Sequence, residues 1–234
     1  MSGRFSGALT GQNASGKLAV IPDIKCVSPK EGDLLCGRDP VEIAKQLAGL
    51  GAPALSVVTE RERFGGSPQL LSSVADATGL PILRKDFIAS ERDLAQTQQM
   101  GASAILLICS LTDRGILSKL YESALKLGLE PFVEVCTAQE MAFACSLGAR
   151  LVGINNRDIA TLELDNGGVS RTATLAPGAP KNAVLISESG IASEDDARLA
   201  ARAGANAVLV GTALLQANDT AAMYQSLCVE LPHP

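Results

Sequence analysis

The chain alternates between short apolar segments and longer stretches in which apolar residues recur with helical spacing. The apolar segments are continuous and rich in β-branched residues. This pattern is typical of strands covered on both faces, and therefore of a parallel sheet. Eight such segments follow one another along the chain: residues 19–25, 54–60, 81–87, 104–110, 131–136, 151–156, 184–189 and 207–212.

Four of the intervening stretches carry clear helix signals: residues 40–50, 90–100, 137–147 and 193–203. The first opens with an Asp followed by Pro, which suit the N-cap and N1 positions. Each of the other three opens with Ser or Thr and has an acidic residue three positions later, as in a capping box. Each of the four ends at or near a Gly-Ala pair, and Gly readily adopts the left-handed conformation that stops a helix.

The repeating unit is therefore a strand, a loop, a capped helix and a glycine stop. Eight strands with intervening helices predict an α/β fold in which the sheet closes into a single-domain (β/α)8, or TIM, barrel. A doubly wound open sheet is the competing architecture, and the eight-fold count favours closure. We expect one domain over residues 1–234, with a barrel at 19–220 between an N-terminal segment (1–18) and a closing helix and tail (221–234).

Composition narrows the classes of partner. The chain has 234 residues, of which 47% are apolar and 19% charged, as in ordinary globular proteins. A net charge of −5, 3% aromatic residues and no Trp argue against nucleic-acid and anionic-membrane surfaces. The N-terminus has no apolar signal region, and none of the six cysteines forms a CxxC pair. We therefore expect a cytoplasmic protein with reduced thiols and with no nucleic-acid or membrane partner.

The histidine count restricts the chemistry further. The one histidine is His233, next to the last residue. A catalytic triad or a His-rich metal site needs an imidazole inside the fold. If the protein is an enzyme, lysines and carboxylates must therefore move its protons, and we expect no metal site.

In such barrels the functional site lies at the carboxyl ends of the strands. There, Asp23 and Lys25 share one strand face, and Lys85 and Glu134 stand within two other apolar segments. Charged side chains are rarely buried without partners, so these are expected to meet at the barrel mouth. They form either a reactive site or a structural ion-pair network that closes the barrel. Arg84 has the opposite parity and is expected to face the helices, as is Asp86.

The last two strands end differently. Ser189-Gly190 and Gly211-Thr212 place small residues where backbone N–H groups can approach a ligand. A phosphate site built from these two loops and a short helix is a recurrent feature of the barrel. The sequence therefore predicts a phosphate subsite at this edge of the mouth.

Seven segments together resemble the indole-3-glycerol phosphate synthase family over residues 19–220: IPDIKCVSP, ALSVVTERERFGGS, LRKDFI, FVEVC, GINNRD, SESGI and VLVGTALL. LRKDF, GINNRD and SESGI in this order are a specific combination. The resemblance implies a small phosphorylated substrate, 1-(2-carboxyphenylamino)-1-deoxyribulose 5-phosphate. Its ring carbon attacks the ribulose carbonyl, CO2 leaves, and water is eliminated to form the indole. The family needs no cofactor, and we expect a monomer or weak homodimer.

The resemblance also implies residue roles. Lys85 corresponds to the general acid of ring closure, Glu134 to its acid–base partner in dehydration, and Lys25 to a cation near the phosphate and the carboxylate. Asp23 occupies a further catalytic position. The expected substrate contacts are Ser28, Asn155, Arg157, Glu188 and Ser189, with Phe64 and Phe87 beside the aromatic ring and Gly190, Gly211 and Thr212 at the phosphate. We also expect burial beside Lys25 to bring the pKa of Lys85 toward neutrality.

The sequence departs from the family pattern in three regions: at Asp23, over the segment from Cys26 to Glu31, and at the N-terminus. Asp23 stands where the family usually has Glu, and Cys26 where it has Arg. In the following loop, Lys30-Glu31 alters the usual order of charges. In the family an N-terminal helix covers the site, and here only residues 5–9 are a candidate remnant of that helix. Two alternatives follow: a diverged paralogue acting on a related arylamino-sugar phosphate, or a non-catalytic phosphate-binding barrel subunit. A phosphoribosylanthranilate isomerase is disfavoured because no matching Cys/Asp pair stands at the strand ends.

Overall fold

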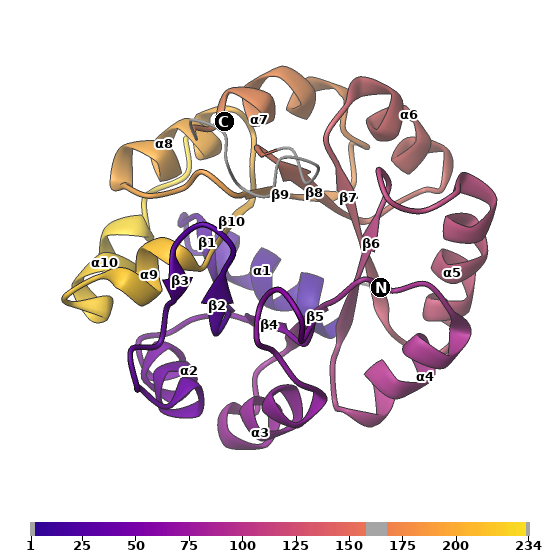
Figure 1. Ribbon diagram of the computed structural model, residues 1–234. Coiled ribbons are helices and arrows are strands. Elements are labelled where there is room, and N and C mark those ends of the chain that lie inside the picture. The colour runs from indigo at the N-terminus through magenta and orange to yellow at the C-terminus, as the bar shows by residue number, and fades with distance from the viewer. Residues whose placement is uncertain (1–2, 158–167, 233–234) are drawn as a thin grey trace.

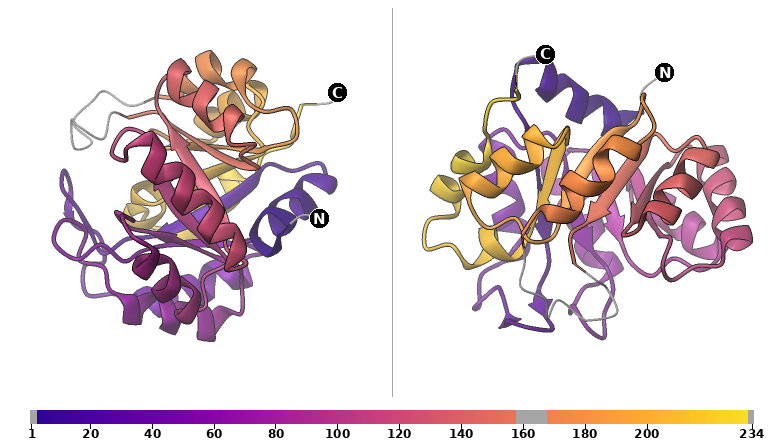
Figure 2. Two further views of the ribbon diagram at one scale, coloured as in Figure 1. Left: turned by 90° about the vertical axis from the view of Figure 1, so that its right-hand side faces the viewer. Right: turned by 90° about the horizontal axis from the view of Figure 1, so that it is seen from above.

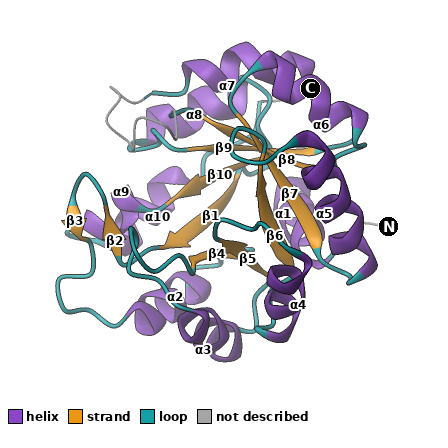
Figure 3. Ribbon diagram, turned by 45° about the vertical axis from the view of Figure 1, so that its right-hand side comes forward, coloured by secondary structure: helices purple, strands orange, loops and turns teal. Residues whose placement is uncertain are grey.

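The computed structural model describes residues 3–157 and 168–232; His233 lies outside these ranges. Eight parallel strands form a closed barrel with helices around it (Figures 1 and 3). The strands are β1 (Ala19–Ile24), β4 (Leu55–Val58), β5 (Ile82–Lys85), β6 (Ala104–Ile108), β7 (Glu130–Val135), β8 (Leu151–Asn155), β9 (Val184–Glu188) and β10 (Ala207–Val210). β1 pairs with β10 on one side and with β4 on the other, which closes the sheet. The eight predicted strands and the barrel are confirmed.

All four predicted helices are present: α2 (Pro40–Gly49), α4 (Glu91–Gln99), α6 (Ala138–Ser146) and α8 (Glu194–Arg202). The capping boxes at Ser90 and Thr137 form as expected, whereas at α8 the Asp196 carboxylate accepts from the Ala192 N–H instead of the Ser193 N–H. The closing helix expected within residues 221–234 is α10 (Thr220–Leu227). The structure adds α3 (Pro68–Thr78), α5 (Arg114–Lys126), α7 (Ser170–Leu175), a 3-10 turn η2 (Ala176–Gly178) and α9 (Thr212–Gln216). In the part of the chain that the structure describes, no helix is both long and apolar enough to span a bilayer.

Alternation along each strand decides which side chains enter the barrel. Ile21, Leu83, Phe132 and Ile186 are fully buried in an apolar cluster inside it. Two positions further along the same strands, and therefore on the same inner face, stand polar side chains. These are Asp23, Lys85, Glu134 and Glu188. On these four strands, the inward-facing residues thus change from apolar to charged over two positions.

Residues of the other parity pack against the helices. Arg84 is buried, and its guanidinium donates to the hydroxyls of Thr59 and Thr97 and to the Asp86 carboxylate. It also donates to the carbonyl of Asp93, at the start of α4. The prediction that Arg84 faces the helices is confirmed, whereas Asp86, for which the same was expected, binds Arg84 and also lines the cavity at the strand ends.

The N-terminal segment folds as α1 (Arg4–Ala14), which closes the amino end of the barrel. Phe5 and Leu9 of α1 are fully buried in the cluster inside the barrel. The Glu130 carboxylate, at the start of β7, accepts from the N–H groups of Phe5 and Ser6. Both views in Figure 2 place α1 at the end of the barrel opposite the β2–β3 hairpin (Val27–Ser28 and Gly32–Asp33). Residues 5–9 therefore do not cover the site, contrary to expectation, because their apolar side chains fill the open lower end.

Candidate active site

A cavity of about 830 Å³ opens at the carboxyl ends of the strands. This volume lies within the range typical of small-molecule sites. Of the fourteen predicted site residues, twelve line it: Asp23, Lys25, Phe64, Lys85, Phe87, Glu134, Asn155, Arg157, Ser189, Gly190, Gly211 and Thr212. The structure therefore brings together residues from seven different strands and their following loops.

The floor of the cavity holds an ion pair. The Lys85 Nζ lies 2.8 Å from Oε2 of Glu188, whose side chain is fully buried behind the lining residues. Glu188 is not among the residues that line the cavity, so the structure shows it as a partner of Lys85. Its expected role as a direct substrate contact stays a prediction.

The pKa of Lys85 moves in the direction opposite to the one expected. Burial alone disfavours the ammonium form, but the carboxylates of Glu188, Asp23 and Glu134 outweigh it and hold the pKa above its ordinary value of 10.5. The expectation of a lowered pKa was wrong because three carboxylates surround Lys85 and dominate over any effect of Lys25. Lys85 therefore carries a proton throughout the physiological pH range.

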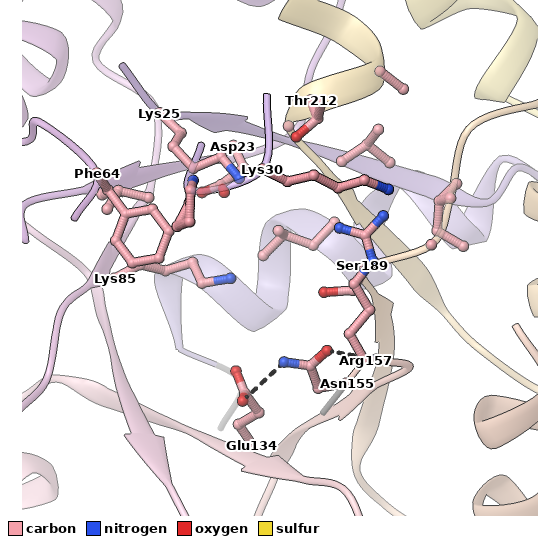
Figure 4. Close-up of a pocket in the computed structure, with 18 of the residues that line it drawn as sticks. Asp23, Lys25, Lys30, Phe64, Lys85, Glu134, Asn155, Arg157, Ser189 and Thr212 are labelled. Carbon is pink, nitrogen blue, oxygen red and sulfur yellow. Dashed lines mark hydrogen bonds between the residues drawn. The ribbon is translucent and has the colours of Figure 1, made fainter. Parts of the chain in front are cut away.

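Glu134 has the complementary perturbation. Its carboxyl group is buried, with Oε1 accepting a hydrogen bond of 3.1 Å from Nδ2 of Asn155 (Figure 4). Burial and the negative charge of Glu188 raise the pKa of Glu134 to about 8, against the opposing effect of Lys85. Among the described residues, Oε1 of Glu188 is buried and accepts from no N–H or O–H group of the protein. A protonated Glu134 supplies a donor for that oxygen, so the two carboxyl groups are suited to share one proton.

Gly153 on β8 makes room for this cluster. A Cβ at this position would lie 2.5 Å from Cζ of Phe132 and 2.6 Å from Oε1 of Glu188. Both distances are far shorter than an ordinary carbon contact. Sequence reasoning missed Gly153; the available signal was a lone glycine inside an apolar strand, which often marks a close approach.

Asp23 and Lys25 form the β1 side of the cavity, and both are buried. Oδ1 of Asp23 accepts a hydrogen bond of 2.6 Å from the Ser56 hydroxyl on the neighbouring strand. The Lys25 ammonium lies 5.6 Å from the centroid of the Phe64 ring, within the range of a cation–π contact. Asp23 thus acts on Lys85 through its charge, while Lys25 lies against the aromatic side of the cavity.

Two phenylalanines contribute the aromatic wall, as expected. Phe64 follows β4 on a loop held by the Glu60 carboxylate, which accepts from the N–H groups of Glu62, Arg63 and Phe64. Phe87 follows β5, is 38% exposed, and has the Arg63 guanidinium 5.3 Å from its ring centroid. An aromatic ligand ring could lie between these loops, above Lys85.

The loop after β9 has a constrained backbone. Ser189 has φ +63°, an unfavourable region for a residue with a side chain, and Gly190 follows with φ +72°. A Cβ on Gly190 would lie 2.7 Å from the carbonyl oxygen of Gly168, so only glycine fits there. Such strain persists where surrounding contacts enforce it, and it is concentrated at functional sites.

Asn156 supplies those contacts. Its Nδ2 donates, at 3.0 Å in each case, to the Ser187 hydroxyl and to the carbonyls of Glu188 and Ser189. Its Oδ1 accepts from the N–H and hydroxyl of Thr172. Asn156 therefore fixes the backbone beneath the predicted phosphate subsite, a role that its position in the sequence did not reveal.

Ser28 lies in the β2–β3 hairpin and does not line the cavity. Its hydroxyl accepts from the N–H groups of Lys30 and Glu31, at 3.3 and 3.4 Å. It thus shapes the turn, and a direct contact between Ser28 and substrate stays a prediction. Lys30 does line the cavity, although it was noted only as a departure from the family pattern.

The cavity combines the predicted phosphate subsite at the ends of β9 and β10, an aromatic wall, and a floor that holds the Lys85–Glu188 ion pair and Glu134. Asn155 connects the floor to Arg157, because its Nδ2 donates to Glu134 while its Oδ1 accepts from the N–H of Arg157 (Figure 4). Within residues 3–157 and 168–232 there is no group of three or more His, Cys, Asp or Glu residues able to hold a metal ion. The chemistry that this arrangement can support is proton transfer by the Lys85 ammonium and the Glu134 carboxyl group.

Comparison with known proteins identifies the family. The family model described as indole-3-glycerol phosphate synthase matches residues 3–227. Proteins of that name from Thermococcus kodakarensis and Pyrococcus furiosus are 45% and 43% identical to the chain, covering 87% and 88% of it and 88% and 89% of their own lengths. A solved thiamine phosphate pyrophosphorylase from Pyrococcus furiosus shares the fold, with a TM-score of 0.64 at 15% identity over 92% of this chain and 96% of that one. The chain belongs to the indole-3-glycerol phosphate synthase family.

Proposed function

We propose that the protein is a carboxy-lyase that converts 1-(2-carboxyphenylamino)-1-deoxyribulose 5-phosphate to indole-3-glycerol phosphate. Family membership over nearly the whole chain supports this reaction. The observation that carries the residue assignment is the buried cluster of Lys85 with Asp23, Glu134 and Glu188 on the cavity floor. It combines an amine that is protonated in the resting protein with a carboxyl group that titrates near neutrality.

Ring closure needs an acid at the ribulose carbonyl. The ring carbon that bears the carboxylate bonds to the carbonyl carbon, and Lys85 gives its proton to the carbonyl oxygen. CO2 then leaves, and its bonding electrons restore the aromatic ring. The carboxylates around Lys85 hold the ammonium in position, and the proton that the reaction consumes returns to Lys85 from solvent because its pKa is raised.

Dehydration needs an acid and a base in turn. The new hydroxyl leaves as water with a proton from Glu134, and the adjacent carbon then gives up a proton, which restores Glu134. A carboxyl group with a pKa of about 8 is populated in both forms near neutral pH, so Glu134 suits both steps. Asn155 holds the carboxyl group in place through its Nδ2.

The cavity fits the three parts of the substrate. The anthranilate ring lies beside Phe64 and Phe87, and its carboxylate faces Lys25 and Arg157. The ribulose carbonyl lies over Lys85. The phosphate lies at the ends of β9 and β10, at Ser189, Gly190, Gly211 and Thr212.

Turnover with purified protein tests the proposal. The protein is incubated with the carboxyphenylamino substrate while indole fluorescence and released CO2 are both followed. We expect the two products to appear in equal amounts, without added metal or cofactor. A folded protein that produces neither would contradict the proposal and favour the diverged paralogue or the non-catalytic subunit.

The partner and location assignments are proposals as well. We infer a cytoplasmic protein whose partner is a small phosphorylated molecule and which is a monomer or a weak homodimer. The net charge of −5 and the low aromatic content support the absence of nucleic-acid and membrane partners. Light scattering over a range of protein concentrations tests the oligomeric state, and a stable assembly larger than a dimer would contradict it.

A further inference from the structure

The β2–β3 hairpin carries a lysine to the edge of the cavity. Val27 and Ser28 pair in antiparallel fashion with Asp33 and Gly32, and Gly32 has φ +73°. The Ser28 hydroxyl accepts from the Lys30 N–H at 3.3 Å and so closes the turn. The turn therefore has a defined shape, with Lys30 near its tip.

The base of the hairpin is anchored on three sides. The Val27 N–H donates to the carbonyl of Phe64 at 3.0 Å, and the Leu34 N–H donates to the carbonyl of Cys26 at 2.9 Å. Leu34 is 1% exposed and belongs to the core between barrel and helices. The Arg38 guanidinium donates to the Leu34 carbonyl at 2.9 Å, after the hairpin ends. These contacts fix the base of the hairpin and so hold its tip at the edge of the cavity.

Lys30 turns inward from this tip. It lines the cavity, and in Figure 4 its side chain runs across the mouth toward the part formed by Arg157, Ser189 and Thr212. Within the described ranges, no ion pair of 4.0 Å or less involves the Lys30 ammonium. The charged side chain toward which it points is another cation, Arg157. An anion that enters between these two cationic side chains is attracted by both of them.

We propose that Lys30 binds the phosphate group of the ligand that occupies this cavity. Phosphate is the group of choice because the Lys30 ammonium points to the end formed by the β9 and β10 loops. Lys25, which the family resemblance places near both the phosphate and the carboxylate, has its ammonium 5.6 Å from the centroid of the Phe64 ring, on the aromatic side of the cavity. The identity of the ligand rests on the proposed function, whereas the anion-binding role of Lys30 rests on the geometry alone.

Lys30→Met tests this assignment, because it removes the charge and keeps an unbranched apolar chain. Lys30→Arg restores the charge, and Lys119→Met removes an exposed lysine of α5 outside the cavity. Binding of sn-glycerol 3-phosphate and of anthranilate is measured by calorimetry at low ionic strength. We expect Lys30→Met to weaken glycerol 3-phosphate binding about tenfold, the typical effect of one charge-assisted contact. Lys30→Arg and Lys119→Met should bind it as the unmodified protein does, and anthranilate binding should be unchanged throughout.

The outcomes separate this inference from the proposed function. Unchanged glycerol 3-phosphate binding in Lys30→Met overturns the inference. A loss of affinity confined to anthranilate also overturns it, because that result would assign Lys30 to the carboxylate. The inference is overturned as well if the unmodified protein does not bind glycerol 3-phosphate at all. If the unmodified protein fails to turn over the carboxyphenylamino substrate while Lys30→Met still loses phosphate affinity, the inference stands and the proposed reaction falls. In an active enzyme the same variant should raise KM more than it lowers kcat.

Discussion

Replacing Gly153 with Ala should displace the buried Lys85–Glu188 ion pair without changing a residue that lines the cavity. Gly153 stands inside the barrel on β8, directly against Phe132 and Glu188. The added methyl group would lie 2.6 Å from Oε1 of Glu188, whereas ordinary carbon contacts begin at 3.4 Å. The Glu188 carboxylate must therefore retreat by about 0.8 Å, and the Phe132 ring must also move.

The size of the effect follows from what Glu188 holds. Its Oε2 lies 2.8 Å from the Lys85 Nζ, so moving the carboxylate moves the ammonium or lengthens the ion pair. A misplacement near 1 Å at a reacting group costs on the order of 10²-fold in rate. Overpacking of a well-filled core costs about 1–3 kcal/mol in the free energy of unfolding. We expect Gly153→Ala to show both losses, with the rate loss mainly in kcat.

Steady-state kinetics and urea unfolding measure the two effects separately. Gly11→Ala is the matched control, because Gly11 is exposed in α1 and a Cβ there meets nothing within 4 Å. It should leave kcat unchanged and the protein equally or slightly more stable. Phe132→Leu, alone and combined with Gly153→Ala, relieves the contact with the ring but not the contact with Glu188. The double variant should therefore regain stability relative to the sum of the single effects while kcat stays low.

Two results would refute this reasoning. Near-normal kcat in Gly153→Ala would show that the position of Glu188 does not control Lys85. A kcat that recovers together with stability in the double variant would show that the loss reflects general core strain rather than displacement of the carboxylate.

Three further changes probe other parts of the molecule. In the unfolded chain Glu134 loses its proton above its ordinary pKa of 4.5, whereas in the folded protein it keeps the proton up to a pH of about 8. Because of this group, the free energy of unfolding falls as the pH rises between these two values. Glu134→Gln should therefore flatten the fall of the unfolding free energy between pH 5 and 8, by up to about 1.4 kcal/mol per pH unit, and an unchanged slope in urea titrations would argue against the buried carboxylic acid. Phe5→Ala should cost about 3–5 kcal/mol of stability, since Phe5 is fully buried, yet leave kcat unchanged below the unfolding temperature; a large kcat loss would place α1 in the catalytic machinery. Asp23→Glu, which restores the usual family residue, should raise kcat/KM for the carboxyphenylamino substrate, and a fall would indicate that the site is matched to another substrate.

The fold could be predicted where the local sequence preferences for strands, helices and caps agree with the tertiary structure. The eight apolar runs became strands because each is buried on both faces, and Ser90 and Thr137 marked helix starts through their own capping bonds. α1 was not anticipated as a plug because its cap comes from Glu130, a residue more than a hundred positions away. The β2–β3 hairpin likewise depends on the Phe64 carbonyl, which belongs to a different loop.

Most residues that line the cavity could be predicted from the sequence, but the effect of their charges on one another could not. Parity along the strands placed Asp23, Lys85 and Glu134 inside the barrel mouth, as the structure confirms. The direction of the Lys85 pKa depends on how close three carboxylates come to one amine, which no spacing within a strand reveals. Asn156 and Gly153 act through contacts with neighbouring strands, and single-sequence patterns carry no record of those distances.

The central claim is that Lys85 supplies the proton for ring closure from within its cage of carboxylates. The most direct measurement compares single-turnover indole formation by the unmodified protein and by Lys85→Ala, each saturated with the carboxyphenylamino substrate, with glycerol 3-phosphate binding measured alongside. Lys85→Ala should form no indole while binding glycerol 3-phosphate nearly as well as the unmodified protein, because the proposed phosphate subsite lies at the ends of β9 and β10 and not at Lys85. Indole formation by a folded Lys85→Ala at close to the normal rate would contradict the account.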